Sequence, residues 1–471
     1  MKLASIFITL LLAFALLASD TIAQPGLYTA INSNGVNRAA EKVLPGFLDR
    51  VRGMTFPNIN DGHHRILDPT ITEIWLSSFE MSITDDGITT LRIHQFNISA
   101  EFRYRYKRKW LRITTGVRAT LGDANFTIQI RLFNDGGRFG LGVEGVHVDA
   151  GEASIKILGK SIKSKMMNAI KSLFKSQIRN AILNNVRDAL YNGIVEFGSN
   201  FVANINLRMG VGDWGSIDLS LVDNIRYGFN SIIVGFSGDV QYHDEHVPTP
   251  VPRPDLPFHP HDQLFSVGVS TFVFNSGFYN YAKKDLFFHM TTKQEPHSYT
   301  GEKLESKVWA KQIPAIQKKF PDKDLRIILR HGIPPTLNSS GGVLKFHADI
   351  YAHIQAGHGD DWADWANAFV LNIALDASAT VALYENRVFP QIQDVTTNLS
   401  VVESNIGNID LAVAVVQHVF QYGTDIAVPI INSQLLPGIP IPINGHIILS
   451  DPQLALPENM MVLSTNVDFQ F

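Results

Sequence analysis

The segment Val247-Pro-Thr-Pro-Val-Pro-Arg-Pro-Asp-Leu-Pro-Phe-His-Pro260 carries proline at nearly every second position. Proline lacks a backbone N–H and fixes φ, so this segment cannot pair as a central strand and favours an extended, stiff conformation. It lies near the middle of the 471 residues. We therefore predict a linker at residues 247–260 that separates an N-terminal module, residues 24–246, from a C-terminal module, residues 261–471.

The two predicted modules share one order of elements without sequence identity between them. In the first, a helix is expected from about Val36 to Val51, then alternating strands from about Ile71 to Leu132, then a long helix from Ser161. In the second, a helix-like stretch at residues 302–320 precedes strands and a long apolar helix at about residues 409–435. This order predicts an α+β fold of two similar units.

The helix predicted from Ser161 has a wide apolar stripe. Apolar residues recur at helical spacing over more than 25 residues, while lysines occupy the other faces. Such a helix must lie against a sheet or a lipid. The first residues of the stripe that we expect to line an apolar interior are Met166, Ile170, Phe174 and Ile178.

The N-terminus has the pattern of a secretory signal peptide. Lys2 supplies a positive charge, the apolar run from Ile6 to Leu17 is too short to span a membrane, and small residues follow. Cleavage is expected after Ala23, with Leu17-Ala18-Ser19 as a second candidate site, so residues 1–23 form the signal peptide. The mature protein is expected to be secreted and extracellular. Four sequons agree with this route and are candidate glycosylation sites: Asn97, Asn125, Asn338 and Asn398.

The chain contains no cysteine, which is unusual for a secreted protein because oxidising compartments permit disulfides. Thiol catalysis, thiolate metal sites and redox switching are therefore excluded. A 45% content of hydrophobic residues is enough to build cores that fold without disulfides.

Residues 102–112 concentrate positive charge and aromatic rings on a chain whose formal net charge is −4. Apolar and basic residues alternate on both sides of a turn near Arg108-Lys109, which predicts a half-buried strand hairpin. Arginine forks match phosphate oxygens, and amphipathic rings fit a lipid headgroup boundary. The alternative is a charged edge that merely resists aggregation. The predicted anionic-lipid site, here called the basic tip, consists of Arg103, Arg105, Lys107, Arg108, Lys109, Trp110, Arg112 and Arg118.

Short motifs along the whole mature chain resemble a known family. They are Pro25-Gly26, Ile31-x-x-x-Gly35-Val36, Phe56-Pro57-Asn58, Ile225-Arg-Tyr-Gly228, His261-Asp262, Phe272-x-Phe274-Asn275-Ser276-Gly277, Lys318-Lys319-Phe320-Pro321, Ser404-Asn405-Ile406-Gly407 and Gly438-Ile-Pro-Ile-Pro442. In their order and spacing the chain resembles the family of bactericidal/permeability-increasing protein, lipopolysaccharide-binding protein and the plasma lipid-transfer proteins.

The resemblance implies an elongated boomerang of two similar barrels, each a twisted antiparallel sheet with long helices, joined by a central sheet and the proline-rich linker. It also implies an apolar pocket for phospholipid acyl chains in each barrel, and a basic N-terminal tip that binds lipid A phosphates. One departure concerns the family's single disulfide. Its helix position corresponds to Arg179, and no cysteine lies near Leu132-Phe133, so packing must replace the link.

The sequence gives little support for catalysis or cofactor binding. Gly210-Val-Gly-Asp-Trp-Gly215 matches a dinucleotide fingerprint, but a strand pattern follows it where a phosphate-binding helix is needed. Gly235-Phe-Ser-Gly238 lacks the spacing of a nucleophile elbow. Histidines 243, 246, 259 and 261 have the chemistry of divalent-metal ligands, but they flank the linker, where polar residues are usually solvated. Trp362 and Trp365 have the chemistry of a membrane-interface anchor, but are expected to pack on the second module. No catalytic residue, metal, cofactor or nucleic-acid partner is therefore predicted.

The sequence thus predicts a secreted, non-enzymatic protein that docks on anionic lipid, either lipopolysaccharide or phospholipid, through the basic tip. Acyl chains would be held in the apolar interior, and an antibacterial role in innate immunity would be consistent with the family. The alternative is a phospholipid or neutral-lipid transfer or carrier protein for which the tip is incidental. Presentation of lipid to an unidentified protein receptor is a third interpretation.

Overall fold

The computed structural model describes residues 24–109, 111–149, 153–158, 206–211, 215–228, 230–242, 249–254, 258, 263–284, 289–291, 304–359, 364–384, 387–410, 439–440 and 447–469, with short helical stretches between 179 and 195 and between 412 and 437. The predicted signal peptide lies outside these residues. So do Met166, Ile170, Phe174 and Ile178, the residues predicted to line the apolar interior.

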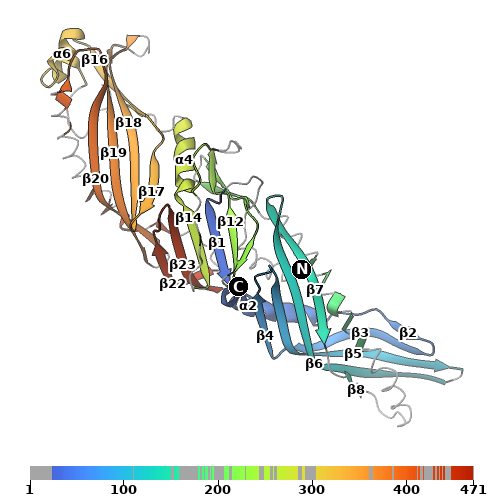
Figure 1. Ribbon diagram of the computed structural model, residues 1–471. Coiled ribbons are helices and arrows are strands. Elements are labelled where there is room, and N and C mark those ends of the chain that lie inside the picture. The colour runs from blue at the N-terminus through green and yellow to red at the C-terminus, as the bar shows by residue number, and fades with distance from the viewer. Residues whose placement is uncertain are drawn as a thin grey trace.

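The molecule is elongated, and a six-stranded antiparallel sheet joins its two halves (Figure 1). The strand order is β11-β12-β1-β14-β23-β22. The strands from the first half are β1 (Leu27–Asn32), β11 (Arg226–Gly228) and β12 (Ser231–Phe236), and those from the second half are β14 (Phe265–Ser270), β22 (Ile447–Ala455) and β23 (Met460–Phe469). The central sheet implied by the family resemblance is therefore present.

The two halves contribute strands to the central sheet in the same arrangement. β1 from the first half and β14 from the second lie in the middle and pair with each other, for example at Thr29↔Val267. Outside each middle strand lies a hairpin from the same half, β11–β12 beside β1 and β22–β23 beside β14. Each middle strand also leads directly into a helix, α2 (Ser33–Val51) after β1 and α4 (Thr271–Lys283) after β14. The two halves therefore share this order of strand and helix at the centre of the molecule, but the helix of the second half lies at residues 271–283 rather than at the predicted residues 302–320.

A second sheet extends from the centre towards one end of the molecule (Figure 1). It has the order β2-β3-β5-β6-β7, with β4 also on β5 and β8 also on β6. The strands are β2 (Ile59–Asp61), β3 (His64–Trp75), β4 (Ser78–Ile83), β5 (Thr89–Arg108), β6 (Leu111–Asp135), β7 (Arg138–Asp149) and β8 (Ala153–Ile157). The alternation predicted between Ile71 and Leu132 is confirmed, because one face of β5 and β6 is buried against the main hydrophobic core.

A third sheet extends towards the opposite end, with the order β15-β16-β18-β19-β20-β21 and β17 also on β18. Its strands are β15 (His289–Thr291), β16 (Asp324–His331), β17 (Thr336–Ser340), β18 (Val343–Gly357), β19 (Ala366–Tyr384), β20 (Arg387–Ser404) and β21 (Ile439–Pro440). A smaller sheet pairs β13 (Asp239–Tyr242), β10 (Gly215–Asp218) and β9 (Arg208–Val211). Every described sheet has two ends in its strand order, so none of them closes on itself within the described residues.

Two local predictions differ from the structure. The helix-like stretch at residues 302–320 is two short helices, α5 (Ser306–Trp309) and α6 (Pro314–Lys319), because Pro314 has no N–H to continue α5 and instead begins α6. The alternation of residues 231–240 predicts one strand, but β12 ends at Phe236 and β13 begins at Asp239. There Gly238, with φ +68°, lets the chain leave the central sheet for β13.

The backbone at Leu132, where the resemblance places the missing disulfide, is held by a tyrosine. The hydroxyl of Tyr227 in β11 accepts a hydrogen bond from the Leu132 N–H and donates one to the Leu132 C=O, both at 3.0 Å. The pairing of β6 with β5 begins only at Ile130, so no strand satisfies these groups on that side. Burial raises the pKa of Tyr227 to about 12. One side chain thus ties the second sheet to the central sheet.

We predict that Tyr227→Phe lowers the free energy of unfolding by about 2 kcal/mol, because two part-buried backbone groups lose their partner. Urea unfolding followed by circular dichroism would measure the change. Tyr191→Phe is the matched control, since the Tyr191 side chain is 44% exposed. Equal stabilities of the two variants would contradict the proposed tie.

A histidine on the third sheet lies between two carboxylates. His347 Nδ1 is 2.8 Å from Asp376 Oδ1, and its Nε2 is 3.3 Å from Asp349 Oδ2. Asp376 is the larger cause that raises the pKa of His347 above its usual value. The folded state therefore favours the imidazolium.

Because the pKa of His347 is raised on folding, its contribution to stability is fully present below the unfolded pKa of about 6.5 and is lost as pH rises through the higher folded pKa. The contribution is below about 1 kcal/mol because the pair is solvent-exposed. We expect His347→Gln to remove this part of the pH dependence when unfolding free energies are compared at pH values just below 6 and above 8. An unchanged pH profile would exclude the interaction.

Candidate functional site

The predicted basic tip lies on the hairpin of β5 and β6, which projects at the lower right end of the molecule (Figure 1). Arg108 pairs with Leu111, so the hairpin turns at Lys109 and Trp110. Lys109 has φ +49°, as the tight turns that match strand twist require. Trp110 lies outside the described residues.

The two faces of this hairpin have opposite character. Phe102 and Tyr104 on β5 are 6% and 2% exposed, whereas Arg103 between them and Arg105 and Lys107 beyond them are exposed. The alternation read from the sequence is therefore confirmed. The inner face anchors the strands, and the outer face presents the cations to solvent.

Aromatic rings close the inner face at the hairpin end. His64 on β3 lies 2.6 Å from the Tyr104 hydroxyl through Nδ1, and its ring centroid is 5.0 Å from that of Tyr106. His63 contacts Tyr106 edge-on, with centroids 6.3 Å apart. Burial raises the pKa of Tyr104 to about 12, so the phenol stays neutral. This packing holds β3 and β5 in register beneath the outer cations.

The register brings basic residues together across strands. Lys107 on β5 lies directly opposite Arg112 on β6. Arg105 lies opposite Arg65 on β3, and Arg65 is exposed. Sequence reasoning missed Arg65, because it is forty residues away in the chain and only the pairing of β3 with β5 reveals it. The sole local signal was its place in an alternating strand next to His63 and His64.

Two residues of the predicted basic tip are already neutralised. Arg103 forms an ion pair with Asp68 on β3. Arg118 donates to Glu101 at 2.6 Å and lies 3.6 Å from Glu73, and the hydrogen bond with Glu101 raises the pKa of Arg118. Both residues lie towards the base of the hairpin. Their charges are therefore compensated within the fold.

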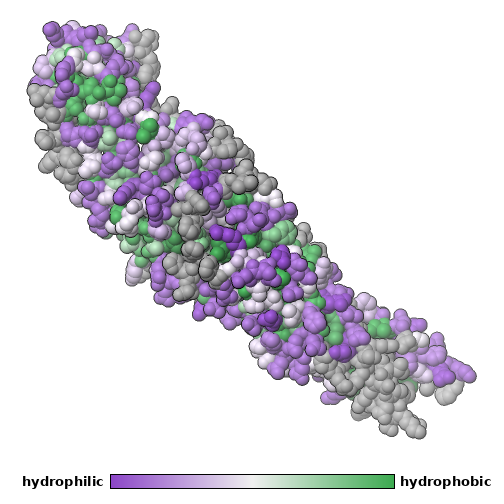
Figure 2. Space-filling view, viewed as in Figure 1, coloured by the Kyte–Doolittle hydropathy of each residue, from purple (hydrophilic) through white to green (hydrophobic). Residues whose placement is uncertain are grey.

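The remaining cations form what we call the exposed cation cluster: Arg65, Arg105, Lys107, Arg108, Lys109 and Arg112. None of them has an acidic partner within 4.0 Å among the described residues. Like charges directly opposite each other destabilise a sheet, so the pairs Arg65–Arg105 and Lys107–Arg112 leave repulsion that no described acidic side chain offsets. Figure 2 shows hydrophilic residues at this end of the molecule.

Described residues line two pockets of particular interest. One, of about 570 Å³, lies beside the linker, and one, of about 430 Å³, lies beside α6 between Ile313 and Ile409. The residues predicted to contact acyl chains fall outside the described ranges, so neither pocket tests that prediction. No described helix is long and apolar enough to cross a membrane.

The predicted sequons are distributed over both halves. Asn125, Asn338 and Asn398 are exposed, and Asn97 is half-buried. The Asn97 side chain donates a hydrogen bond to the Gln95 C=O. Asn97 lies eleven residues before Arg108 along β5, which at roughly 3.3 Å per residue places it about 35 Å from the hairpin end. A glycan there leaves the exposed cation cluster free.

The other sequence candidates do not join this cluster. Trp365 packs beneath Arg326 of β16, with the guanidinium 4.3 Å from the ring centroid, which confirms its expected packing on the second half. Trp362 and histidines 243, 246, 259 and 261 lie outside the described residues. The glycine fingerprint at Gly210 is followed by strand β10, as its alternation predicts.

A family model described as the LBP / BPI / CETP family, C-terminal domain, matches residues 213–469. Lipopolysaccharide-binding protein of Mus musculus is 26% identical over 259 residues, which are 54% of this chain and 52% of that protein. Bactericidal permeability-increasing protein of Sebastes schlegelii is 22% identical over 268 residues, 56% of each chain. The chain thus spans about half the length of these curated relatives. Lipopolysaccharide-binding protein of Oryctolagus cuniculus matches over 99% of this chain and 98% of its own length at 21% identity.

The fold also has a solved counterpart. The crystal structure of lipopolysaccharide binding protein matches 95% of this chain and 100% of its own with a TM-score of 0.52, at 18% identity. This likeness concerns the fold alone. The motif resemblance found in the sequence is confirmed by the family model, which covers more than half of the 471 residues. The chain belongs to the LBP / BPI / CETP family.

Proposed function

We propose that the protein is a secreted, non-enzymatic lipid-binding protein that docks on anionic lipid, lipopolysaccharide or phospholipid, through the end of the β5–β6 hairpin. The observation that carries this proposal is the exposed cation cluster, whose cross-strand pairs of like charge lack acidic partners among the described residues. Relatives named for binding lipopolysaccharide and for permeabilising bacteria support it, and they favour an antibacterial role in innate immunity.

The size of the electrostatic effect is sufficient for reversible docking. Each Lys or Arg near an anionic membrane surface contributes about 1 kcal/mol. Six such residues give about 6 kcal/mol, a dissociation constant of tens of micromolar before any acyl chain is bound. Burial of acyl chains then supplies the rest of the affinity, at about 0.8 kcal/mol for each buried CH₂.

The proposal extends the organisation predicted from the sequence. Modules 24–246 and 261–471 each form a barrel-like container, and the stripe that begins with Met166 and Ile170 lines the interior of the first. Residues 1–23 direct secretion, and the sequons carry N-linked glycans.

Vesicle co-sedimentation tests the docking step. The purified protein should bind vesicles of phosphatidylcholine that contain phosphatidylserine or lipopolysaccharide, and binding should fall steeply as salt rises from 50 to 500 mM because the surface charges are screened. Pure phosphatidylcholine vesicles are the control. Equal binding to both kinds of vesicle, insensitive to salt, would refute the proposal.

A second candidate is lipid transfer or carriage without a role for the hairpin end. It is favoured by the family match at residues 213–469, which includes much of the central sheet and the C-terminal half but not the exposed cation cluster. Transfer of fluorescent phospholipid between neutral vesicles, unaffected by lipopolysaccharide, would support this candidate.

A further inference from the structure

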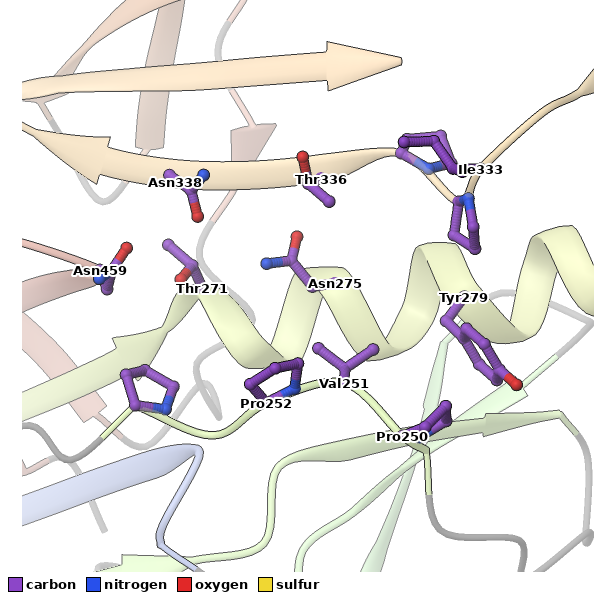
Figure 3. A pocket seen from close by; sticks show the side chains of 13 residues that line it. Pro250, Val251, Pro252, Thr271, Asn275, Tyr279, Ile333, Thr336, Asn338 and Asn459 are labelled. Carbon is purple, nitrogen blue, oxygen red and sulfur yellow. The ribbon is translucent and has the colours of Figure 1, made fainter. Parts of the chain in front are cut away.

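The pocket of about 570 Å³ lies where the linker crosses the second half of the chain (Figure 3). The linker segment Pro250–Pro254 forms one wall, and the residues from Ile333 to Asn338, at the start of β17, form the other. Helix α4 lies between them and contributes Thr271, Asn275 and Tyr279. The pocket is therefore shared by segments that are far apart in the sequence.

The wall formed by the linker is fixed at both of its ends. The hydroxyl of Thr249 donates to Asp239 at 3.1 Å, and the guanidinium of Arg253 donates to the Ser237 C=O at 3.0 Å. On the opposite side, Asn275 bonds both the N–H and the C=O of Leu337 in β17, at 2.6 and 3.0 Å. The pocket is thus formed before any ligand arrives.

Among the described residues, no charged side chain lines this pocket. The apolar lining comes from prolines, Val251, Ile333 and the ring of Tyr279. The side chains of Thr271, Thr336, Asn338 and Asn459 face the same space, and none of these side chains makes a hydrogen bond within the described part of the chain. The lining suits a neutral ligand with many hydroxyl groups and apolar C–H faces, which is the chemistry of a sugar rather than of an ion or an acyl chain.

Asn338 itself supplies such a ligand. It is the acceptor of the sequon Asn338-Ser-Ser340, and its side chain extends from β17 towards α4 in Figure 3. We propose that the pocket holds the innermost sugars of an N-linked glycan on Asn338. The volume lies within the roughly 300–1,000 Å³ of small-molecule sites and accommodates pyranose rings. The inference rests on the proposed secretion and glycosylation.

The chemistry of attachment is that of N-glycosylation. Asn338 Nδ2 forms a bond to C1 of the first sugar and loses a proton, while the C1–O bond to a lipid-linked diphosphate donor breaks and the diphosphate leaves. Within the folded strand Asn338 and Ser340 are both exposed on one face, while Ser339 is 1% exposed and bonds the Met460 C=O at 3.1 Å. The docked sugar would brace the linker against α4 and β17.

Native deglycosylation tests the inference. The full chain is secreted from a glycosylating host, treated with peptide-N-glycosidase without denaturant, and each sequon is followed by glycopeptide mass spectrometry. The glycan on Asn338 should be released about tenfold or more slowly than that on exposed Asn398, a ratio that corresponds to about 1.4 kcal/mol. After denaturation the two sites should be released at equal rates.

Variants distinguish docking of the glycan in the pocket from modification of the sequon at Asn338. Tyr279→Ala should raise the release rate at Asn338 to that at Asn398 and leave the occupancy of both sites unchanged. If that variant is not secreted, Ile333→Ala serves instead, since the Ile333 side chain is 51% exposed. Ser340→Ala, which removes the sequon but keeps Asn338, should lower Tm by a few degrees, whereas Ser400→Ala, which removes the sequon at Asn398, should not.

The outcomes are distinguishable. Slow release at Asn338 that is abolished by Tyr279→Ala or Ile333→Ala supports the docked glycan. Occupied Asn338 released as quickly as Asn398 overturns the docking and leaves the proposed glycosylation intact. Unmodified Asn338 beside modified Asn398 also overturns it. If no sequon carries sugar in the secreted protein, the glycosylation proposed above fails as well.

Discussion

Replacement of Arg105, Lys107, Arg108 and Arg112 together by serine is expected to weaken binding to anionic vesicles by about a thousandfold. Each surface cation contributes about 1 kcal/mol near such a membrane, and every 1.4 kcal/mol is a factor of ten. All four side chains are exposed on the hairpin, and none has an acidic partner among the described residues. The fold should tolerate the change, because like charges across β5 and β6 are removed. Vesicle co-sedimentation at low salt would measure the loss.

The opposite end of the molecule provides a matched control. Four lysines without an acidic partner among the described residues lie on and around α6, far from the hairpin in Figure 1: exposed Lys311, Lys318 and Lys319, and half-buried Lys323. Their replacement by serine removes the same formal charge and should leave vesicle binding within a factor of a few. If both quadruple variants lost binding equally, net charge rather than the position of the cations would govern docking.

Arg103 and Arg118 provide an internal comparison. Their ion pairs with Asp68 and Glu101 already compensate their charge. Arg103→Ser should therefore reduce vesicle binding less than Arg105→Ser does. A larger loss for Arg103 would mean that the ion pair with Asp68 opens when lipid binds.

Arg253→Ala is expected to lower the free energy of unfolding by about 3 kcal/mol. The guanidinium donates to the C=O groups of Gln24 and Ser237 at 3.2 and 3.0 Å and lies 4.1 Å from the ring centroid of Phe272. Hydrogen bonds to a charged group contribute about 1.5–3 kcal/mol, and a cation–π contact adds about 1 kcal/mol. Burial lowers the pKa of Arg253, which agrees with its enclosed position. Urea unfolding would measure the loss.

Arg226→Ala is the control, because Arg226 is exposed on the same central sheet, 5.7 Å from the ring centroid of Tyr28. It should cost less than about 1 kcal/mol. Arg253→Ala should in addition leave Asp239, which is 2% exposed, without the nearby positive charge that offsets its burial. Equal effects of the two substitutions would show that Arg253 does not anchor the linker.

Local alternation in the sequence predicted the strands of the hairpin and which side chains face outwards, because the side-chain period of a strand depends only on neighbouring residues. The pairing of β3 with β5 brings in Arg65 and joins Arg103 to Asp68. These contacts depend on register between strands distant in the chain, which a single sequence does not specify. The sequence therefore predicted where exposed cations gather, but not that Arg65 joins them or that Arg103 is paired with Asp68.

Helix α4 illustrates another limit. Its first residues, Thr271-Phe-Val-Phe274, are β-branched or aromatic and have low intrinsic helix propensity. The helix forms because the Ser270 side chain accepts a hydrogen bond from the Phe272 N–H, and because Phe272 is 1% exposed. Tertiary burial overrides local preference here. Pro314, by contrast, begins helix α6 at the first helical position, where its missing N–H costs no hydrogen bond.

The strand order of the central sheet limits when its strands can pair during synthesis. β1, at residues 27–32, can pair with β12 only after residue 236 has left the ribosome, and β14 can pair with β23 only after residues 460–469 have been made. Such long loops close slowly. A nonsense mutation that removes residues 447–471 would leave β14 as an unprotected edge able to recruit strands from other molecules, so premature stop codons should yield retained aggregates rather than a shortened active product.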